Sequence, residues 1–231
     1  MCIRDRFYSI MSFKKKKYEL VKNAISFDLA NFIFNYFLMH RDVTFYMIHN
    51  RIIREGNPLF GSWQDSQVPR TYAHYGNQVM DTLLMKMLPL TSKLTGLSLI
   101  PTYSYARIYK KGDVLVRHKD RHSCEVSTTI HLGGDKWPIF IDPTGKSGVV
   151  KALSNNKVIL KKNPPKGVSV NLNVGDMMIY RGCDLEHWRT RFKGKTCAQV
   201  FLHYNDASKP EAKLNTFDKR VMLGLPATTR G

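Results

Sequence analysis

Two ionisable side chains, His118 and Asp120, lie two residues apart in the stretch RHKDRHSCEVSTTIHLGG, just before an alternating run typical of a β-strand. A His-x-Asp pair alone is weak evidence for a metal site, because the spacing occurs by chance. A third candidate ligand, His187, follows Asp120 by 67 residues (187 minus 120) in GDMMIYRGCDLEHWR. Two neutral imidazoles and one carboxylate are the ligand set of non-haem Fe(II) oxygenases. That set leaves three positions open, which suit a bidentate 2-oxo acid and O₂.

β-Structure must position these ligands, because the hydrophobic period from Leu97 onward is two. We expect strands near 98–109, 114–117, 124–132, 138–141, 147–153, 168–173, 176–181, 185–190 and 196–204. Two amphipathic helices should precede them, over 26–39 with a Ser26 cap and over 77–96 with a stop at Gly96. The pattern predicts a mainly β (α+β) fold: a sandwich, barrel or jelly roll with helices on one outer face.

The bulk composition is that of an ordinary globular protein. The 231 residues predict one domain, with no apolar run long enough for a spanning helix and no signal-peptide core, so we expect a cytoplasmic protein without membrane contact. Four scattered cysteines predict reduced thiols rather than a disulfide framework. A formal charge of +18 would attract anions, including nucleic acid, although the lysines are spread along the chain.

Further motifs around the candidate ligands resemble the 2-oxoglutarate and Fe(II)-dependent dioxygenases, in particular their prolyl 4-hydroxylase-like branch. The motifs are RIYKKGDVLVRHKD, the strand CEVSTTIHL, GDMMIYRGCDLEH and the closing strand KTCAQVFLHY. The resemblance implies a double-stranded β-helix (jelly roll) over about 98–206. It implies that His118, Asp120 and His187 are the catalytic iron ligands, with 2-oxoglutarate and O₂ as cosubstrates and ascorbate as an optional reductant.

The family also needs a basic residue after the distal histidine to bind the far carboxylate of 2-oxoglutarate. Stepping back six residues from Phe201 gives Lys195, which we rank slightly ahead of Arg189, with Arg191 as a further competitor. The family usually has one residue between the glycine and this basic residue, whereas Lys195 directly follows Gly194. Tyr109 matches a family tyrosine near the cosubstrate. Thr129 or His131, on the opposing strand, could complete its hydrogen bonding.

The domain division expected is a basic N-terminal extension over 1–25, a single dioxygenase domain over 26–206 and a C-terminal tail over 207–231. The opening MCIRDRF resembles translated adapter sequence, so these residues carry no weight.

The leading hypothesis is a hydroxylase of an unactivated C–H bond in a peptidyl or free amino acid, releasing succinate and CO₂. Another small-molecule substrate stays open, and the sequence is silent on oligomeric state. One alternative is a nucleic-acid oxidative demethylase, which the charge encourages but the arginine-free closing strand does not. The other alternative is a non-catalytic, metal-stabilised jelly-roll binding module.

Overall fold

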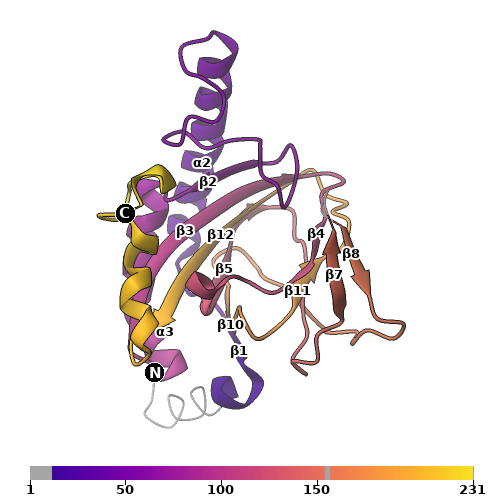
Figure 1. The fold of residues 1–231 in the computed structure, drawn as a ribbon. Coiled ribbons are helices and arrows are strands. Elements are labelled where there is room, and N and C mark those ends of the chain that lie inside the picture. The colour runs from indigo at the N-terminus through magenta and orange to yellow at the C-terminus, as the bar shows by residue number, and fades with distance from the viewer. Residues whose placement is uncertain (1–11, 154–156, 231) are drawn as a thin grey trace.

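A computed structural model of the protein describes residues 12–153 and 157–230. Within these ranges the strands form two main sheets and one hairpin, and their pairings are antiparallel (Figure 1). The larger sheet contains, in spatial order, β1 (Tyr18–Val21), β10 (Met177–Arg181), β5 (Val126–Gly134), β12 (Thr196–Asp206), β3 (Leu99–Lys110) and β2 (Tyr72–Tyr75). The smaller sheet contains β4 (Leu115–His118), β11 (His187–Arg189), β6 (Ile139–Ile141) and β9 (Val168–Val170). The hairpin consists of β7 (Val149–Leu153) and β8 (Lys157–Leu160). This is the jelly roll that the sequence predicted.

Two helices pack on the larger sheet. α2 (Phe27–His49) begins after Ser26, whose Oγ accepts a hydrogen bond from the backbone N–H of Leu29, and α3 (Gln78–Thr95) ends at the left-handed Gly96. Ile33 and Phe37 of α2 and Leu84 of α3 share one hydrophobic cluster with side chains of β5, β10 and β12. The helices therefore cover the outer face of this sheet and leave its inner face to the smaller sheet.

α2 differs from the prediction in length and in phase. It continues to His49 rather than ending near residue 39, and its far end projects beyond the sheets (Figure 1). The helical spacing of Phe32, Ile33, Tyr36 and Phe37 predicts one core face for all four. Phe32 is instead 67% exposed, because the buried stripe runs through Ala30, Ile33 and Phe37. A helix rich in aromatic residues on several sides does not reveal from its sequence which side is buried.

Three short strands were not predicted: β1, β2 and β8. β1 follows the lysine run and pairs with β10, so part of the predicted N-terminal extension belongs to the larger sheet. β8 lies within NNKVILKKNPPKG, a basic segment whose composition predicts a turn-rich connection between strands. The MCIRDRF segment lies outside the described residues.

The C-terminal segment packs against the domain through polar contacts. It contains the 3₁₀ elements η2 (Pro210–Lys219), which contacts β3, and η3 (Ala227–Thr229); a third 3₁₀ turn, η1 (His122–Cys124), precedes β5. The buried Arg220 Nη1 lies 3.0 Å from Asp81 Oδ2 of α3. Cys124, Cys183 and Cys197 are free thiols. Among the described helices, none has the length and apolarity required to cross a bilayer.

Candidate metal centre and adjoining cavity

The two predicted histidine ligands meet across a pair of neighbouring strands. His118 ends β4 and His187 begins β11, and the two residues are direct cross-strand partners. Cross-strand neighbours project to the same face, which brings the imidazole centroids to 4.3 Å. A three-residue sequence element and a distant histidine thus become adjacent through strand pairing alone.

Asp120 completes the cluster from the turn after β4. Its backbone N–H donates to the carbonyl of Gly182 at 2.9 Å, which fixes the turn beside β10. Asp120 Oδ1 then lies 3.6 Å from His118 Nε2 and 3.4 Å from His187 Nε2. One ligand atom from each of the three residues lies within 4.8 Å of the others.

Backbone carbonyls fix the tautomer of both imidazoles. His118 Nδ1 lies 2.7 Å from the Val116 carbonyl, and His187 Nδ1 lies 3.1 Å from the Leu185 carbonyl. A carbonyl can only accept, so each Nδ1 carries a proton, and the Nε2 of the neutral ring keeps the lone pair that can bind a metal. This arrangement orients histidine ligands in metalloproteins.

Burial and mutual charge set the ionisation of the cluster. Burial opposes ionisation of Asp120, but the attraction of His187 and hydrogen bonds from both histidines hold the pKa of its carboxyl well below the usual value. Burial, followed by repulsion from His187, lowers the pKa of His118. Burial also disfavours the charged form of His187, yet Asp120 outweighs it and raises the His187 pKa. With one anionic oxygen and two imidazole lone pairs converging, the donor set fits a divalent transition metal.

A cavity of about 130 Å³ opens beside these three side chains. Its other lining residues are Gln67, Tyr103, Tyr105, Arg107, Leu115, Ile139, Tyr180, Phe201 and His203. Arg107 reaches into it from β3 and binds the loop before β2: its Nε donates to Asp65 Oδ2 at 2.5 Å and its Nη2 to Gln67 Oε1 at 2.5 Å. Gln67 Nε2 in turn lies 2.8 Å from His118 Nε2. The loop therefore forms one wall of the metal cluster.

The three candidates for the carboxylate clamp lie in different surroundings. Arg189 is 1% exposed on β11, with its guanidinium carbon 5.2 Å from the centroid of the Trp137 ring and its Nη1 donating to the Trp137 carbonyl. Its Nε and Nη2 have no hydrogen-bond partner within the described ranges. Lys195 and Arg191 are both exposed. Lys195 precedes β12 and lies in a turn where its N–H donates to Asp135 Oδ2. Neither Lys195 nor Arg189 is among the residues that line the cavity.

Tyr109 and His131 lie close to Arg189. Tyr109 is fully buried: burial raises the pKa of its hydroxyl, and the charges of Arg107 and Arg189 oppose that rise. The Thr129 hydroxyl donates to Gln199 Oε1 at 3.0 Å, which turns Gln199 Nε2 toward His131 Nδ1 at 2.9 Å. His131 must therefore carry its proton on Nε2, an atom with no partner in the described part of the chain. Burial, with repulsion from Arg189, lowers the pKa of His131 to about 4, so the ring is neutral near pH 7.

Sequence reasoning missed several residues of this site. Arg107 shares a strand face with Tyr103, Tyr105 and Tyr109, and that alternation was a usable signal. Asp65 and Gln67 lie in an irregular loop, where no periodicity indicates which side chains point inward.

Comparisons with known proteins identify the fold. No protein-family model matches the sequence, and no curated protein matches it. Among solved structures, a prolyl-4-hydroxylase from Pseudomonas putida aligns with a TM-score of 0.53 at 10% identity, covering 87% of this chain and 98% of its own. The chain has the fold of the 2-oxoglutarate-dependent oxygenases.

Two further structures share this oxygenase fold. AviO1 from Streptomyces viridochromogenes Tue57 aligns with a TM-score of 0.60 at 13% identity, over 92% of this chain and 100% of its own. HygX from Streptomyces hygroscopicus, with nickel and 2-oxoglutarate bound, aligns with a TM-score of 0.56 at 13% identity, over 90% of this chain and 88% of its own. The oxygenase fold thus spans nearly the whole chain.

Proposed function

We propose that the protein is an Fe(II)- and 2-oxoglutarate-dependent dioxygenase that hydroxylates an unactivated C–H bond. The observation that carries the proposal is the convergence of His118 Nε2, Asp120 Oδ1 and His187 Nε2 beside a cavity. A structural metal site closes its coordination shell, whereas three ligands on one side leave room for reactants.

In this proposal His118, Asp120 and His187 hold Fe(II). When bound, the iron couples the oxidative decarboxylation of 2-oxoglutarate by O₂, which yields succinate and CO₂, to insertion of the second oxygen atom into the substrate C–H bond. The backbone carbonyls of Val116 and Leu185 keep both imidazoles in the ligand tautomer. No separate acid–base pair of the protein is required.

Arg189 binds the far carboxylate of 2-oxoglutarate in this proposal. Its unpartnered Nε and Nη2 are adjacent donors of one planar guanidinium, a geometry that matches the two oxygens of a carboxylate. The His131 Nε2–H and the Tyr109 hydroxyl are further donors in the same region. A dicarboxylate would satisfy these buried groups, which otherwise cost folding free energy.

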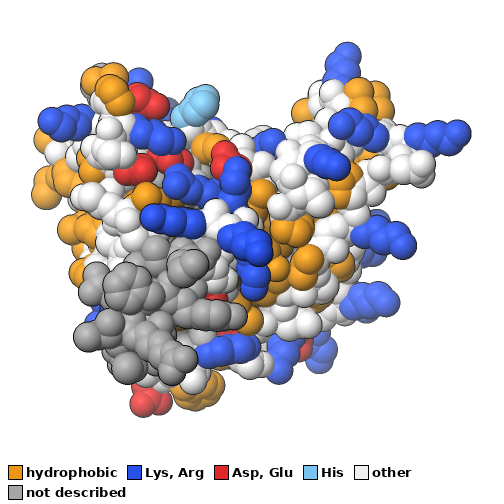
Figure 2. All heavy atoms as spheres, turned by 90° about the horizontal axis from the view of Figure 1, so that it is seen from below, with side chains coloured by type: hydrophobic (Ala, Val, Ile, Leu, Met, Phe, Trp, Pro, Cys, Tyr) orange, Lys and Arg blue, Asp and Glu red, His pale blue; other side chains and the backbone are white. Residues whose placement is uncertain are grey.

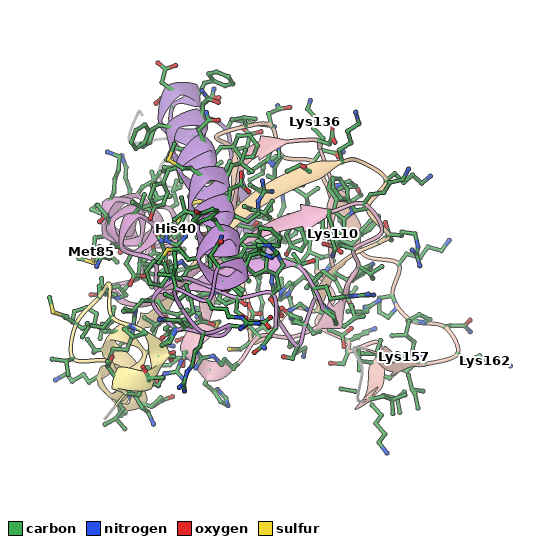
Figure 3. The ribbon with its side chains drawn as sticks, turned by 90° about the horizontal axis from the view of Figure 1, so that it is seen from above. His40, Met85, Lys110, Lys136, Lys157 and Lys162 are labelled. Atoms are coloured by element: carbon green, nitrogen blue, oxygen red, sulfur yellow. The ribbon has the colours of Figure 1, made fainter. Side chains whose placement is uncertain are left out.

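For the substrate we propose a peptidyl or free amino acid, with a prolyl residue as the first candidate. The cavity wall combines aromatic rings with the Gln67 amide and the Arg107 guanidinium, which suits an apolar side chain attached to a polar backbone. Lys and Arg side chains are spread over the face seen from below in Figure 2. In Figure 3 Lys136 lies apart from Lys157 and Lys162, which lie near each other at another edge of the molecule. This scatter does not favour a nucleic-acid groove.

The test is anaerobic addition of Fe(II) and then 2-oxoglutarate to the purified protein. We expect a weak visible metal-to-ligand charge-transfer band that needs both additions. After O₂ and ascorbate are admitted, slow formation of succinate should follow even without substrate. Asp120→Ala should abolish both signals, whereas the exposed-site control Lys195→Met should retain them. Bound iron with neither band nor succinate would instead indicate a non-catalytic metal-stabilised module.

A further inference from the structure

The second carboxylate oxygen of Asp120 has its own hydrogen-bond donor. Oδ1 faces the two imidazoles, whereas Oδ2 accepts a hydrogen bond of 2.7 Å from the hydroxyl of Ser127 on β5. Ser127 is completely buried, so water cannot replace this donor. The two oxygens of one carboxylate are thus in different environments.

Ser127 is itself held by His203. His203 is the cross-strand partner of Ser127 on β12, and its Nδ1 lies 3.0 Å from the Ser127 oxygen. The single hydroxyl proton goes to the charged carboxylate, the strongest acceptor in reach. His203 Nδ1–H must therefore be the donor to Ser127, which gives the chain His203 to Ser127 to Asp120. The His203 ring packs on Tyr103 with centroids 4.6 Å apart, which fixes its orientation.

Gly182 closes the remaining space around Oδ2. A Cβ atom at this position would lie 2.3 Å from Asp120 Oδ2 and 2.6 Å from the Ser127 oxygen. The same glycine accepts the Asp120 backbone N–H through its carbonyl. The carboxylate is therefore enclosed on its Oδ2 side by the protein and open on its Oδ1 side.

We propose that Ser127 and His203 are positioning residues that make Asp120 a one-oxygen ligand of the metal. This inference rests on the proposed function, in which Asp120 binds iron. A carboxylate with both oxygens free can chelate a metal through both and occupy two coordination positions. With Oδ2 engaged by Ser127, Asp120 takes one position, and three remain for a bidentate 2-oxo acid and O₂.

A second metal site is the competing interpretation of the same residues. Asp120, Cys124 and His203 also have ligand atoms within 4.8 Å of one another. Each already has a hydrogen-bonding partner, however: Ser127 binds Asp120 and His203, and the Tyr103 hydroxyl lies 3.0 Å from Cys124 Sγ. A cluster whose members satisfy one another needs no ion, so we expect one metal per chain.

Cobalt(II), which is stable in air and absorbs in the visible range, is the probe for the test. Calorimetric and spectroscopic titrations should show one cobalt per wild-type chain. Ser127→Ala should weaken cobalt binding about 10- to 100-fold, the usual effect of losing a partner of a metal ligand. It should also weaken 2-oxoglutarate binding to the cobalt-loaded protein, because the freed Oδ2 competes for a coordination position. Ser127→Thr keeps the hydroxyl and should retain most of the affinity.

The matched control is Thr128→Val, on the same strand. The Thr128 hydroxyl is buried without a partner among the described residues, so its replacement should leave cobalt binding unchanged. Circular dichroism and melting curves confirm that each variant folds. His203→Phe keeps the aromatic packing on Tyr103 but removes the donor, and should weaken binding even where Ser127→Ala folds poorly.

The double variant distinguishes a connected chain from two separate structural effects. If His203 acts through Ser127, Ser127→Ala combined with His203→Phe should bind cobalt no more weakly than Ser127→Ala alone. The inference would be overturned if the losses of cobalt affinity in the two single variants multiplied in the double variant, or if Ser127→Ala bound cobalt as tightly as the wild type. Either result would leave the metal site itself intact. Two cobalt ions per chain would favour the second metal site. A wild-type protein that binds no cobalt would instead overturn the proposed function, and this inference with it.

Discussion

Replacing Arg189 by methionine should stabilise the fold and abolish binding of 2-oxoglutarate. Arg189 is a 1% exposed cation with no carboxylate partner in the described part of the chain, and two of its nitrogens make no hydrogen bond there. Burial consequently lowers its pKa despite the nearby polar groups. Such a charge is tolerated in a protein interior when a ligand neutralises it.

The expected size of the effect follows from the contacts. Two buried unsatisfied N–H groups cost about 1.5 kcal/mol each, or about 3 kcal/mol together. Their removal is offset by loss of the cation–π contact with Trp137, about 1 kcal/mol, and of one hydrogen bond, also about 1 kcal/mol. Methionine fills much of the same volume. The net gain is about 1 kcal/mol, which corresponds to a rise in Tm of about 2–4 °C.

Melting curves of metal-loaded protein with and without 2-oxoglutarate provide the assay. At about 100 times its Kd, 2-oxoglutarate should stabilise the wild type by about 2.7 kcal/mol and raise its Tm by about 5–10 °C. Arg189→Met should have a higher Tm than the wild type without 2-oxoglutarate, and adding 2-oxoglutarate should not raise it further. Lys195→Met should behave as the wild type because Lys195 is exposed. A variant that loses several kcal/mol, or that still responds to 2-oxoglutarate, would refute the reasoning.

Three further changes to the protein test buried contacts that stabilise the fold around the site. Arg117→Met should lower the free energy of unfolding, measured by urea denaturation, by about 3–5 kcal/mol. Arg117 lies 2.8 Å from Asp142 and 2.5 Å from Glu186, so its loss leaves two buried carboxylates without their cation. An unchanged urea midpoint would contradict this. Burial, with repulsion from His40, lowers the pKa of His74 from 6.5 to about 3, so the stability it contributes is complete above pH 6.5 and is lost as pH falls toward 3. His74→Phe should flatten the pH dependence of the unfolding free energy in that window, and an equally steep dependence would argue against the assignment. Truncation after Asp206 removes Arg220 and leaves the buried Asp81 without its cation, so the melting temperature should fall by several degrees; an unchanged temperature would contradict a structural role for the C-terminal segment.

Local patterns predicted most of the strands from Leu97 onward and the proposed metal ligands, but not the residues around those ligands. His118, Asp120 and His187 could be named because residue type, spacing and the order of the strands agreed. Lys195 was ranked first by counting an even number of residues along a strand, yet β12 begins only at Thr196, and the rule of alternation does not extend into the preceding turn. Arg189 satisfies the same rule from within β11, and its side chain is buried whereas that of Lys195 is exposed. The boundaries of short strands are the least predictable feature of a sequence, and the start of β12 is the reason that we propose Arg189 rather than Lys195.

The buried polar atoms of the site divide into two groups with different consequences. The groups that orient the metal cluster are paired within the protein: Val116 and Leu185 hold the imidazoles, and Ser127 holds Asp120. The groups near Arg189 are not paired, since Arg189 Nε and Nη2 and His131 Nε2 lack partners among the described residues. Paired groups keep their geometry without a ligand, so the proposed metal ligands are preorganised. Unpaired donors raise the free energy of the folded protein until an anion arrives, so part of the stability should appear only when a dicarboxylate binds. Stability measured with and without 2-oxoglutarate therefore reports on the cosubstrate region, while metal affinity reports on the ligand cluster.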